Sequence, residues 1–490
     1  MCAVNRALAL PLIIPMLQTE IAVMRFGLGA RPGDLQAAAA DPRGWLRAQT
    51  QGAVALTGAG PLTPSDQIIA AALAAREERR ERKRDSAAPA AAAEANALGN
   101  ALREVYQPHY HAQVLARAQS AAATTRPFGE RLVHFWSNHF AISADKGAIY
   151  GLAGALENEA IRPHVNGRFI DLLTAAVTHP AMIVFLDNQL SAGADSAAAR
   201  LAATRFGAAR AAAAPPRGQF GINENLAREI LELHTLGVDG GYTQQDVTSF
   251  AQIITGWSVG GGGGRLAGGE VGRFYFRDNL HQPGGKTLLG KSYPQYGEAQ
   301  GLAVLADLAT HPSTAHFIAT KLVRHFVADD PPAAAVERVT RAYRESGGEL
   351  PRVYAALIDA PEAWDAQLRK FKTPEDFVFS TLRALEAAPQ KSPEVIRSFE
   401  LLGQRQYTPG SPAGWADTAK SWDGPDALMH RVLWASRVAE RFEKGQSALD
   451  LAASCLGGFA RPETLAALKR AASGSQALAL LLMSPEFQRR

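Results

Sequence analysis

Residues Asn223–Gly237 have the sequence NENLAREILELHTLG, whose apolar spacing predicts an amphipathic helix. At about 100° per residue, the leucines, Ile230 and Ala227 share one arc of that helix. His234 falls in the middle of this apolar arc and Glu229 falls at its edge. Because a buried ionisable group needs a partner, each is either a hydrogen-bonded core residue or part of a site.

The chain on either side of this segment contains further helix signals. Gly237 is the expected C-cap, and Thr243 with Asp246 three residues later predicts a second helix that runs to about Trp257. Thr373–Asp376 (TPED) predicts another start, with threonine as the N-cap and proline at the first helical position. Alanine is abundant and apolar spacings of three and four dominate, so we expect a mainly α protein, a large single unit of many helices.

One region differs from this helical pattern. Arg273–Phe276 predicts a short strand and Lys286–Leu289 a return strand, so a small β-hairpin is expected near residues 272–292. Two alanine-rich stretches, Ser86–Ala97 and Ser191–Gly218, predict low-complexity inserts. We expect a helical core over residues 20–385, with residues 386–490 forming a C-terminal helical segment packed on it.

The N-terminus predicts a weak leader over residues 1–19. Ala7–Met16 is apolar and follows Arg6, as in a short signal peptide, but two prolines interrupt it. No stretch reaches the ~18 apolar residues of a transmembrane helix. A periplasmic or extracellular location is expected, and the weakness of the leader leaves the cytoplasm open.

Composition excludes several functional classes. The 490 residues include only two cysteines, which excludes a disulfide framework and cysteine-based metal motifs. The net charge of +4 is too small for a chain of this length to indicate nucleic-acid binding. Twelve histidines remain, so a transition-metal site would depend on His, Asp and Glu side chains.

The segment Glu130–Phe140 (ERLVHFWSNHF) predicts a buried aromatic helix with a polar stripe. His134 and Asn138 lie on that stripe with Arg131 beside it, while His139 falls within the apolar arc. The residues are either part of a site or hydrogen-bonded members of the core.

Two more segments carry candidate residues for ligand binding. In His311–Val327, Lys321 and His325 lie four residues apart at the edge of an apolar face, where they bind a ligand or extend to solvent. His281 and Lys286 lie on the predicted hairpin, in a glycine-rich setting that lets a ligand approach the backbone.

No motif with a known mechanism accompanies these residues: HExxH, a Walker loop, GxSxG and a dinucleotide fingerprint are all absent. The best catalytic candidates are His134 and His234 as base or ligand, Glu229 as orienting carboxylate and Asn138 as a polar positioner. If a metal is bound, its ligands are expected from His134, His139, Glu229 and His234. No particular cofactor is indicated.

The chain resembles the large bacterial family catalogued as "domain of unknown function 1800". The segment at 223–247 is the most specific part of the resemblance, which covers roughly residues 20–480. The other matching stretches are Arg25–Gly33 (RFGLGARPG), HFWSNHF at 134–140, TGW at 255–257, KTLLG at 286–290, the segment at 311–327 and PAGW at 412–415.

The resemblance implies that the protein is exported and works beside a second protein. Members are commonly predicted to be exported and are often encoded beside the family "domain of unknown function 1501", which looks like the alkaline phosphatase and sulfatase superfamily. Such a partner suits a role on extracytoplasmic polymers. The chain departs from the family where His281-Gln282 replaces the usual His-Asp, which removes a carboxylate.

Three functions therefore stay open. The first is an enzyme, a hydrolase or transferase acting on extracytoplasmic polymers or their modifications. The second is a non-catalytic helical scaffold that binds a partner protein. The third is a His/Glu metalloprotein. The sequence identifies neither a substrate nor an oligomeric state.

Overall fold

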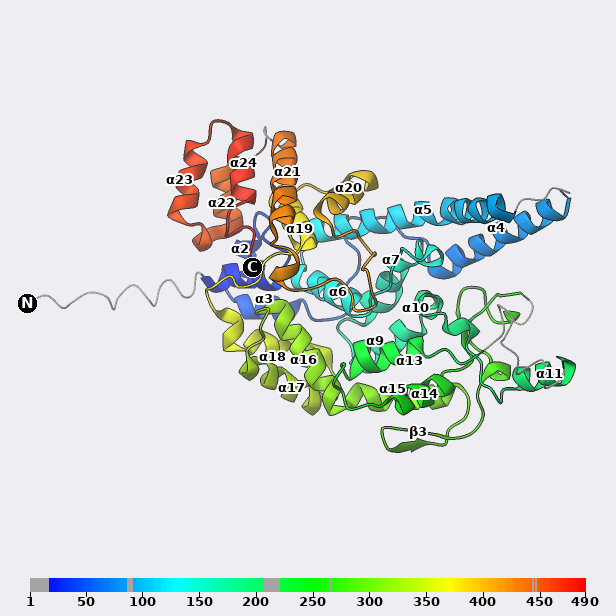
Figure 1. Ribbon diagram of the computed structural model, residues 1–490. Helices are drawn as coiled ribbons and strands as arrows, with labels where there is room; N and C mark the ends of the chain where they lie inside the picture. The colour runs from blue at the N-terminus through cyan, green and yellow to red at the C-terminus, as the bar shows by residue number, and fades with distance from the viewer. Residues whose placement is uncertain (1–16, 86–90, 207–220, 264–265, 443–444, 446) are drawn as a thin grey trace, which may run out of the picture.

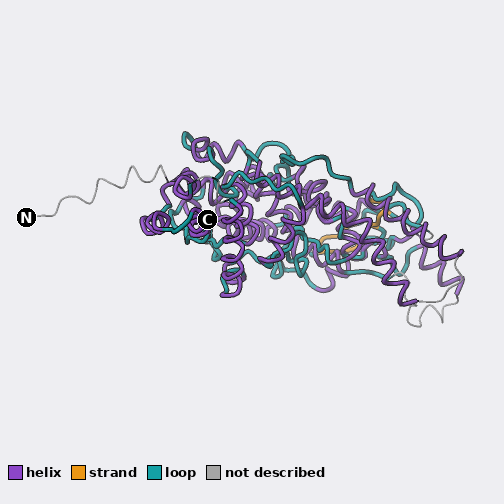
Figure 2. Tube along the Cα trace, turned by 90° about the horizontal axis from the view of Figure 1, so that it is seen from above, coloured by secondary structure: helices purple, strands orange, loops and turns teal. Residues whose placement is uncertain are grey.

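The computed structural model describes residues 17–85, 91–206, 221–263, 266–442, 445 and 447–490, and it is mainly helical (Figures 1 and 2). Residues 1–16 of the predicted leader, and parts of both low-complexity inserts, residues 86–90 and 207–220, lie outside the described residues. The mainly α prediction is confirmed. No helix in the described ranges has the length and apolarity needed to cross a bilayer.

The elements follow one another along the chain in three groups. The first contains η1 (Ala22–Phe26), α2 (Asp34–Ala38), α3 (Pro42–Ala48), α4 (Ser65–Asp85), α5 (Ala91–Ala123), α6 (Pro127–His139), η2 (Gly147–Ile149), α7 (Ala153–Leu156), η3 (Glu157–Ile161), α8 (Arg162–His164), α9 (Phe169–Thr178) and α10 (Pro180–Phe185). The second contains η4 (Asn188–Leu190), α11 (Ala197–Phe206), α13 (Asn225–Glu229), η5 (Ile230–Thr235), α14 (Gln244–Ile253), β1 (Trp257–Val259), β2 (Phe274–Phe276), η7 (Asp278–Leu280), β3 (Lys286–Leu288) and β4 (Lys291–Tyr293). The third contains α15 (Glu298–Thr310), α16 (Pro312–Phe326), α17 (Ala333–Ser346), α18 (Leu350–Asp359), η8 (Pro361–Trp364), α19 (Pro374–Ala384), α20 (Ser392–Leu402), η9 (Ala419–Ser421), α21 (Pro425–Arg441), α22 (Ala448–Leu456), η10 (Gly457–Phe459), α23 (Pro462–Arg470) and α24 (Gly474–Leu482).

Three features position these elements in space. The long helices α4 and α5 lie side by side and project from one end of the molecule, whereas α21–α24 form a group at the opposite end (Figure 1). Helices α6 and α16 lie between these ends, and one cluster of buried apolar residues extends from Ile21 to Phe487.

The predicted helix caps are confirmed. Thr243 and Asp246 form a reciprocal capping box at the start of α14, and the Thr373 side chain accepts a hydrogen bond from the Asp376 N–H at the start of α19. The prediction that the helix after Thr243 continues to about Trp257 is wrong, because α14 ends at Ile253 and Trp257 begins β1.

The segment at 223–237 is not a regular α-helix throughout. It begins as α13 and continues as the π-helical turn η5, which contains His234. A π-turn inserts an extra residue per turn, which rotates the following side chains away from the positions of a regular helix. His234 is nevertheless buried, as its place in the apolar arc predicted.

The region at 272–292 forms two antiparallel pairs instead of one hairpin. β2 pairs with β1, with Tyr275 opposite Ser258, and β3 pairs with β4, with Thr287 opposite Ser292. The two predicted strands, Arg273–Phe276 and Lys286–Leu289, therefore do not pair with each other. β2 pairs instead with Trp257–Val259, which precedes it, and β3 pairs with Lys291–Tyr293, which follows it, so residues 277–285 connect two separate strand pairs.

The C-terminal residues return to the segment before α19. Phe371 and Arg489 form an antiparallel bridge, and the N–H of Lys372 donates to the carbonyl of Gln488. This pairing buries the Arg490 side chain completely and directs it toward α16.

Candidate functional site

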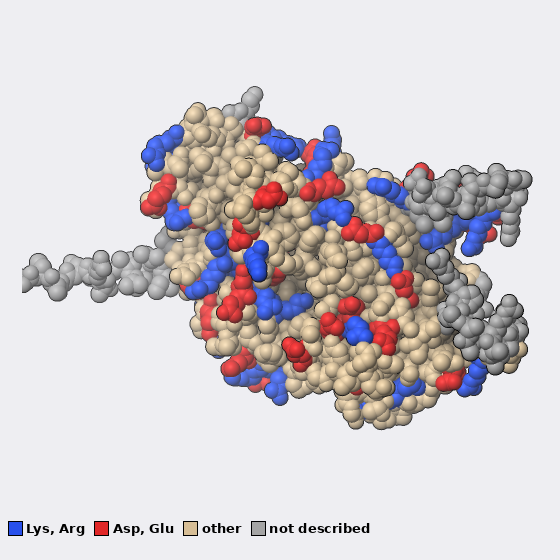
Figure 3. All heavy atoms as spheres, in the orientation of Figure 1, with Lys and Arg blue, Asp and Glu red and all other residues tan. Residues whose placement is uncertain are grey.

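A cavity of about 450 Å³ lies between α6, α16, the start of α19 and the loop at residues 413–418. Its size is within the range of pockets that bind small molecules. Figure 3 shows a hollow near the middle of the visible face, with Lys and Arg atoms beside it. The residues that line the cavity are Leu28, Arg131, His134, Phe135, Asn138, His139, Lys321, Arg324, His325, Asp329, Thr373, Glu375, Asp376, Gln404, Ala413, Trp415, Ala416, Asp417 and Thr418.

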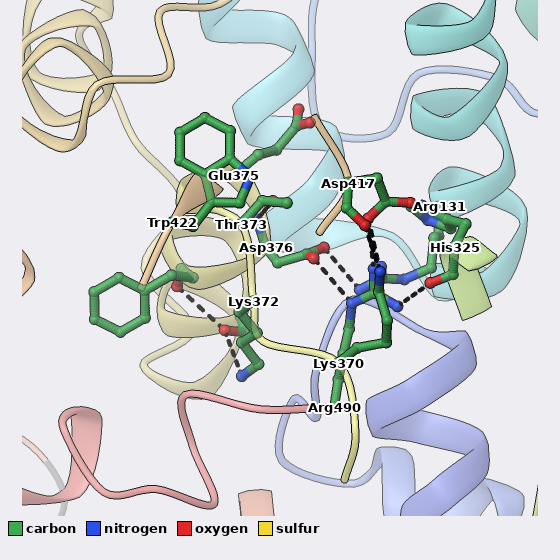
Figure 4. A network of polar contacts seen from close by, with 12 residues as sticks. Arg131, His325, Lys370, Lys372, Thr373, Glu375, Asp376, Asp417, Trp422 and Arg490 are labelled. Carbon is green, nitrogen blue, oxygen red and sulfur yellow. Dashed lines mark hydrogen bonds and ion pairs between the residues drawn. The ribbon is translucent and has the colours of Figure 1, made fainter. Parts of the chain in front are cut away.

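A cluster of buried ion pairs forms one wall of the cavity (Figure 4). Asp376 Oδ1 accepts from Arg131 Nη2 at 2.9 Å, and Asp376 Oδ2 accepts from Arg490 Nε at 2.9 Å. Burial raises the pKa of Asp376, but Arg131 and Arg490 outweigh burial and hold that pKa well below its usual range. Asp376 is therefore ionised at neutral pH.

Asp417 holds His325 in a defined orientation within the same cluster (Figure 4). His325 Nδ1 and Asp417 Oδ2 are 2.7 Å apart, and Lys370 Nζ also lies 3.4 Å from Asp417 Oδ1. The pKa of Asp417 is about 2, because His325 and Lys370 outweigh the effect of burial. Burial lowers the pKa of His325 to about 4 against the influence of Asp417. A neutral His325 that donates Nδ1–H to Asp417 has its lone pair on Nε2, and this atom has no hydrogen-bond partner among the described residues.

A second histidine contacts the lysine of the cavity. His139 Nε2 lies 3.1 Å from the carbonyl oxygen of His234, so Nε2 must carry the proton, and Nδ1 accepts from Lys321 Nζ at 3.0 Å. Burial, with the charge of Lys321, lowers the pKa of His139 well below its usual value. Burial also lowers the pKa of Lys321 to about 8. The pair is a neutral imidazole and an ammonium group at neutral pH.

Asn138 joins α6 to the loop at 413–418. Its Nδ2 donates to the carbonyl of Trp415 at 2.9 Å, and its Oδ1 accepts from the N–H of Trp415 at 2.7 Å. Gly414 has a φ of +84°, and a Cβ there would lie 2.4 Å from the Asn138 carbonyl oxygen. The amide of Asn138 thus positions the loop that carries Asp417.

His134 adjoins a buried chain of ion pairs. Its Nε2 lies 3.5 Å from Glu130 Oε1, beyond a well-formed hydrogen bond, and its ring packs on Phe379. Glu130 accepts two hydrogen bonds from Arg162, at 2.8 and 2.7 Å, and Arg162 also contacts Glu157. These contacts link α6 to α8 and η3, so the surroundings of His134 fulfil a structural role.

Four of the predicted residues do not line the cavity. His234 is buried on Phe140, neither of its ring nitrogens has a hydrogen-bond partner among the described residues, and burial lowers its pKa to about 3. Glu229 is half-buried, and burial together with Glu232 raises its pKa to about 7. His281 Nδ1 lies 3.2 Å from the carbonyl of Thr255, and Lys286 donates to two carbonyls of its own turn.

The cavity does gather six of the predicted residues. These are Arg131, His134, Asn138, His139, Lys321 and His325. His139 lies beside His234, with ring centroids 6.1 Å apart. Within the described ranges, no three His, Cys, Asp or Glu side chains are grouped so that they could hold a metal ion.

Sequence reasoning missed the acidic half of the cavity and several of its cations. Asp376 was recognised only as a helix-capping residue, and Asp417 stands two residues after the PAGW stretch without any signal of its own. Lys370 and Arg490 lie in segments that carry no motif, and Arg324 lies in the candidate segment at 311–327 but was not singled out. The side chains of Lys370 and Arg490 hydrogen-bond to partners between 41 and 165 residues away, so no local pattern could reveal them.

Comparison with curated proteins and with solved structures gave no match. The sequence model of the family described as "Protein of unknown function (DUF1800)" matches residues 21–489, nearly the whole chain. The resemblance inferred from the motifs is therefore confirmed, and the chain belongs to the DUF1800 family.

Proposed function

We propose that the chain is an enzyme whose active site is the cavity between α6 and α16, with His325 as proton acceptor. The observation that carries the proposal is the 2.7 Å contact between Asp417 Oδ2 and His325 Nδ1. A carboxylate in this position fixes the imidazole tautomer and stabilises the imidazolium that forms when Nε2 takes a proton.

Two guanidinium groups next to His325 supply donors for a developing negative charge. Arg131 Nη1 and Arg490 Nη2 are buried and make no hydrogen bond to the described residues, and Arg490 Nη2 lies 3.7 Å from Asp417 Oδ1. Both groups are already held in place by Asp376, so they would not need to reorganise during reaction. Fixed donors of this kind stabilise an oxyanion in the transition state more effectively than water does.

The reaction class that fits this set is a hydrolysis or group transfer in which a hydroxyl or a water loses its proton to His325. We extend the proposal to extracytoplasmic polymers or their modifications as substrates, with a protein of the "domain of unknown function 1501" family as partner. The support for this extension is what the family resemblance implies about export and gene neighbours. Export itself is part of the proposal.

The test compares the purified chain with its His325→Asn variant on a panel of cell-wall and extracellular polysaccharides that carry acetyl, phosphate or sulfate groups. Mass spectrometry of released products should show turnover by the wild type and a loss of about 10²–10⁴-fold in kcat for the variant. The matched control is His430→Asn, since His430 forms an exposed pair with Asp426 on α21. No turnover on any polymer, or an unchanged rate for His325→Asn, would contradict the proposal.

A second candidate is a scaffold that binds a partner protein through α21. Four large apolar side chains of this helix are exposed, Leu428, Met429, Val432 and Leu433. Contiguous exposed apolar side chains mark interaction surfaces. Under this reading, Met429→Asp with Val432→Asp abolishes a complex with the neighbouring gene product in size-exclusion chromatography, and His325→Asn leaves it intact.

A further inference from the structure

The carboxylates of the cavity all have cationic partners from the protein. Asp376 is bound by Arg131 and Arg490, and Asp417 by His325 and Lys370. Asp329 is bound by Lys370 and by the N–H of Ala419, and Glu375 pairs with Arg117. These groups neutralise one another within the fold.

Two cations of the cavity are left without a carboxylate. Lys321 and Arg324 both line it, and neither forms an ion pair with any residue in the described part of the chain. They stand three residues apart on α16, which makes them neighbours on one helix face. The wall formed by α16 therefore carries an excess of positive charge toward the cavity.

The partner of Lys321 cannot neutralise it. His139 must use its Nε2–H for the carbonyl of His234, so its Nδ1 offers only a lone pair. One of the three ammonium protons is directed to this lone pair and two remain for another acceptor. The same ammonium lies 5.5 Å from the centroid of the Phe317 ring. An aromatic ring attracts a cation only weakly and does not neutralise its charge.

The distance between these cations and His325 determines how far the anionic group of a ligand lies from its reacting group. Lys321 and His325 are four residues apart, about 6 Å along α16, whereas Arg131 and His139 are separated by about 12 Å along α6. Lys321 lies next to His139 and His325 lies next to Phe135, so the two helices run in opposite directions along the cavity. An anion at Lys321 is thus about one helical turn from the proposed reacting group, and Arg131 stands toward the other end of the cavity along α6.

We propose that Lys321 and Arg324 form a subsite for an oxyanion, a carboxylate, sulfate or phosphate, carried by the ligand about one helical turn from the group that reacts at His325. The inference deepens the proposed function and rests on it for the identity of the reacting end. It assigns two roles to the two cationic walls. Lys321 and Arg324 recognise a charge already present in the substrate, and Arg131 with Arg490 meets a charge that develops during reaction.

The test measures binding by calorimetry at pH 6.5 and low salt. The probes are glucuronate, glucose 6-sulfate, glucose 6-phosphate and glucose, with inorganic phosphate and sulfate to separate free anions from sugar-borne ones. We expect at least one anionic sugar to bind at least tenfold more tightly than glucose. Lys321→Met and Arg324→Gln should each weaken that binding at least tenfold, and Lys469→Met, a change at an exposed lysine of α23, should not.

A pH series gives a readout that a structural role would not produce. The charged and titratable groups around Lys321 are His139, His234, Arg324 and Asp417. Because the pKa of Lys321 is about 8, anion affinity should fall as pH rises through about 8 and should persist to pH 9 in Lys321→Arg. Melting temperatures near that of the wild type establish that the variants fold.

The outcomes separate the two proposals. Anion binding that survives His325→Asn while turnover is lost supports both. Equal affinity for anionic and neutral sugars, or unchanged affinity in Lys321→Met and Arg324→Gln, overturns the subsite even if His325→Asn abolishes turnover. Intact turnover in His325→Asn with anion binding that depends on Lys321 overturns the proposed catalytic role and leaves the subsite standing.

Discussion

Lys372 illustrates at the scale of one residue how this fold accommodates buried charge. Its side chain is almost fully buried, Nζ donates to Ser380 Oγ at 2.9 Å, and the ammonium lies 4.1 Å from the Phe487 ring centroid. Burial lowers the pKa of Lys372 to about 7. Below that pH the native state must hold a poorly solvated charge, which lowers stability.

Replacing Lys372 with methionine should stabilise the protein at low pH. The pKa in the unfolded chain is about 10.4, so between pH 7 and 10 the unfolded state binds more protons and stability rises with pH. Lys372→Met removes this contribution, and we expect a gain of roughly 1–3 kcal/mol at pH 6 that shrinks by pH 9. Urea denaturation at both pH values measures it, with exposed Lys391→Met as control. A loss of stability at pH 6 would mean that the Ser380 and Phe487 contacts outweigh burial.

At the scale of elements, the loop at 413–418 is placed by its contact with α6. The Asn138 side chain hydrogen-bonds both the N–H and the carbonyl of Trp415. Gly414 lies so close to the Asn138 backbone carbonyl that a side chain at this position would not fit. The loop then presents Asp417 to His325 on α16. The spacing between α6, the loop at 413–418 and α16 therefore depends on Gly414.

Gly414→Ala should displace this loop. The substitution combines a left-handed backbone conformation with a Cβ 2.4 Å from an oxygen atom, and we expect a loss of more than about 1 kcal/mol in the free energy of unfolding. Fluorescence of Trp415 and the affinity for the anionic probes should change with it. Gly410→Ala is the matched control, because a Cβ there meets no atom within 4 Å. Equal stability of the two variants would argue against a fixed loop.

At the scale of the whole molecule, the C-terminal residues complete the ion-pair cluster. Arg490 reaches Asp376 on α19 and the carbonyl of His325 on α16, and its exposed neighbour Arg489 points away. The cluster thus couples the group α21–α24, through the chain that follows α24, to the helices around the cavity (Figure 1).

Arg490→Met should destabilise the chain far more than Arg489→Met. The first change leaves Asp376 and Asp417 each with one buried cation fewer, and we expect a loss of about 3–5 kcal/mol. The second removes only an exposed charge beside Phe371, worth less than about 1 kcal/mol. Urea unfolding at pH 7 compares them, and similar losses would show that Arg490 is not a necessary member of the cluster.

Much of the helical structure could be predicted because its signals are local. The caps at Thr243 and Thr373 and the burial of His234 depend on residues within a few positions of one another, and the structure has them as predicted. The strand pairing predicted near 272–292 was wrong, because β3 pairs with the adjacent β4 and β2 pairs back with β1, which is farther from β2 along the chain than β3 is. The π-helical turn at 230–235 could not be predicted, because the spacing of the apolar residues there is that of a regular α-helix.

The sequence by itself determined a mainly helical member of the DUF1800 family, with His134 on a polar stripe, His139 within an apolar arc, and Lys321 and His325 at the edge of an apolar face. Only the tertiary structure decided which of these residues meet. Asp417, Asp376 and Arg490 join His325 across separations of tens to hundreds of residues, because the free energy of a buried charge depends on which partners surround it in space. Apolar periodicity can show that a helix face is buried, but it contains no information about the charge that faces it.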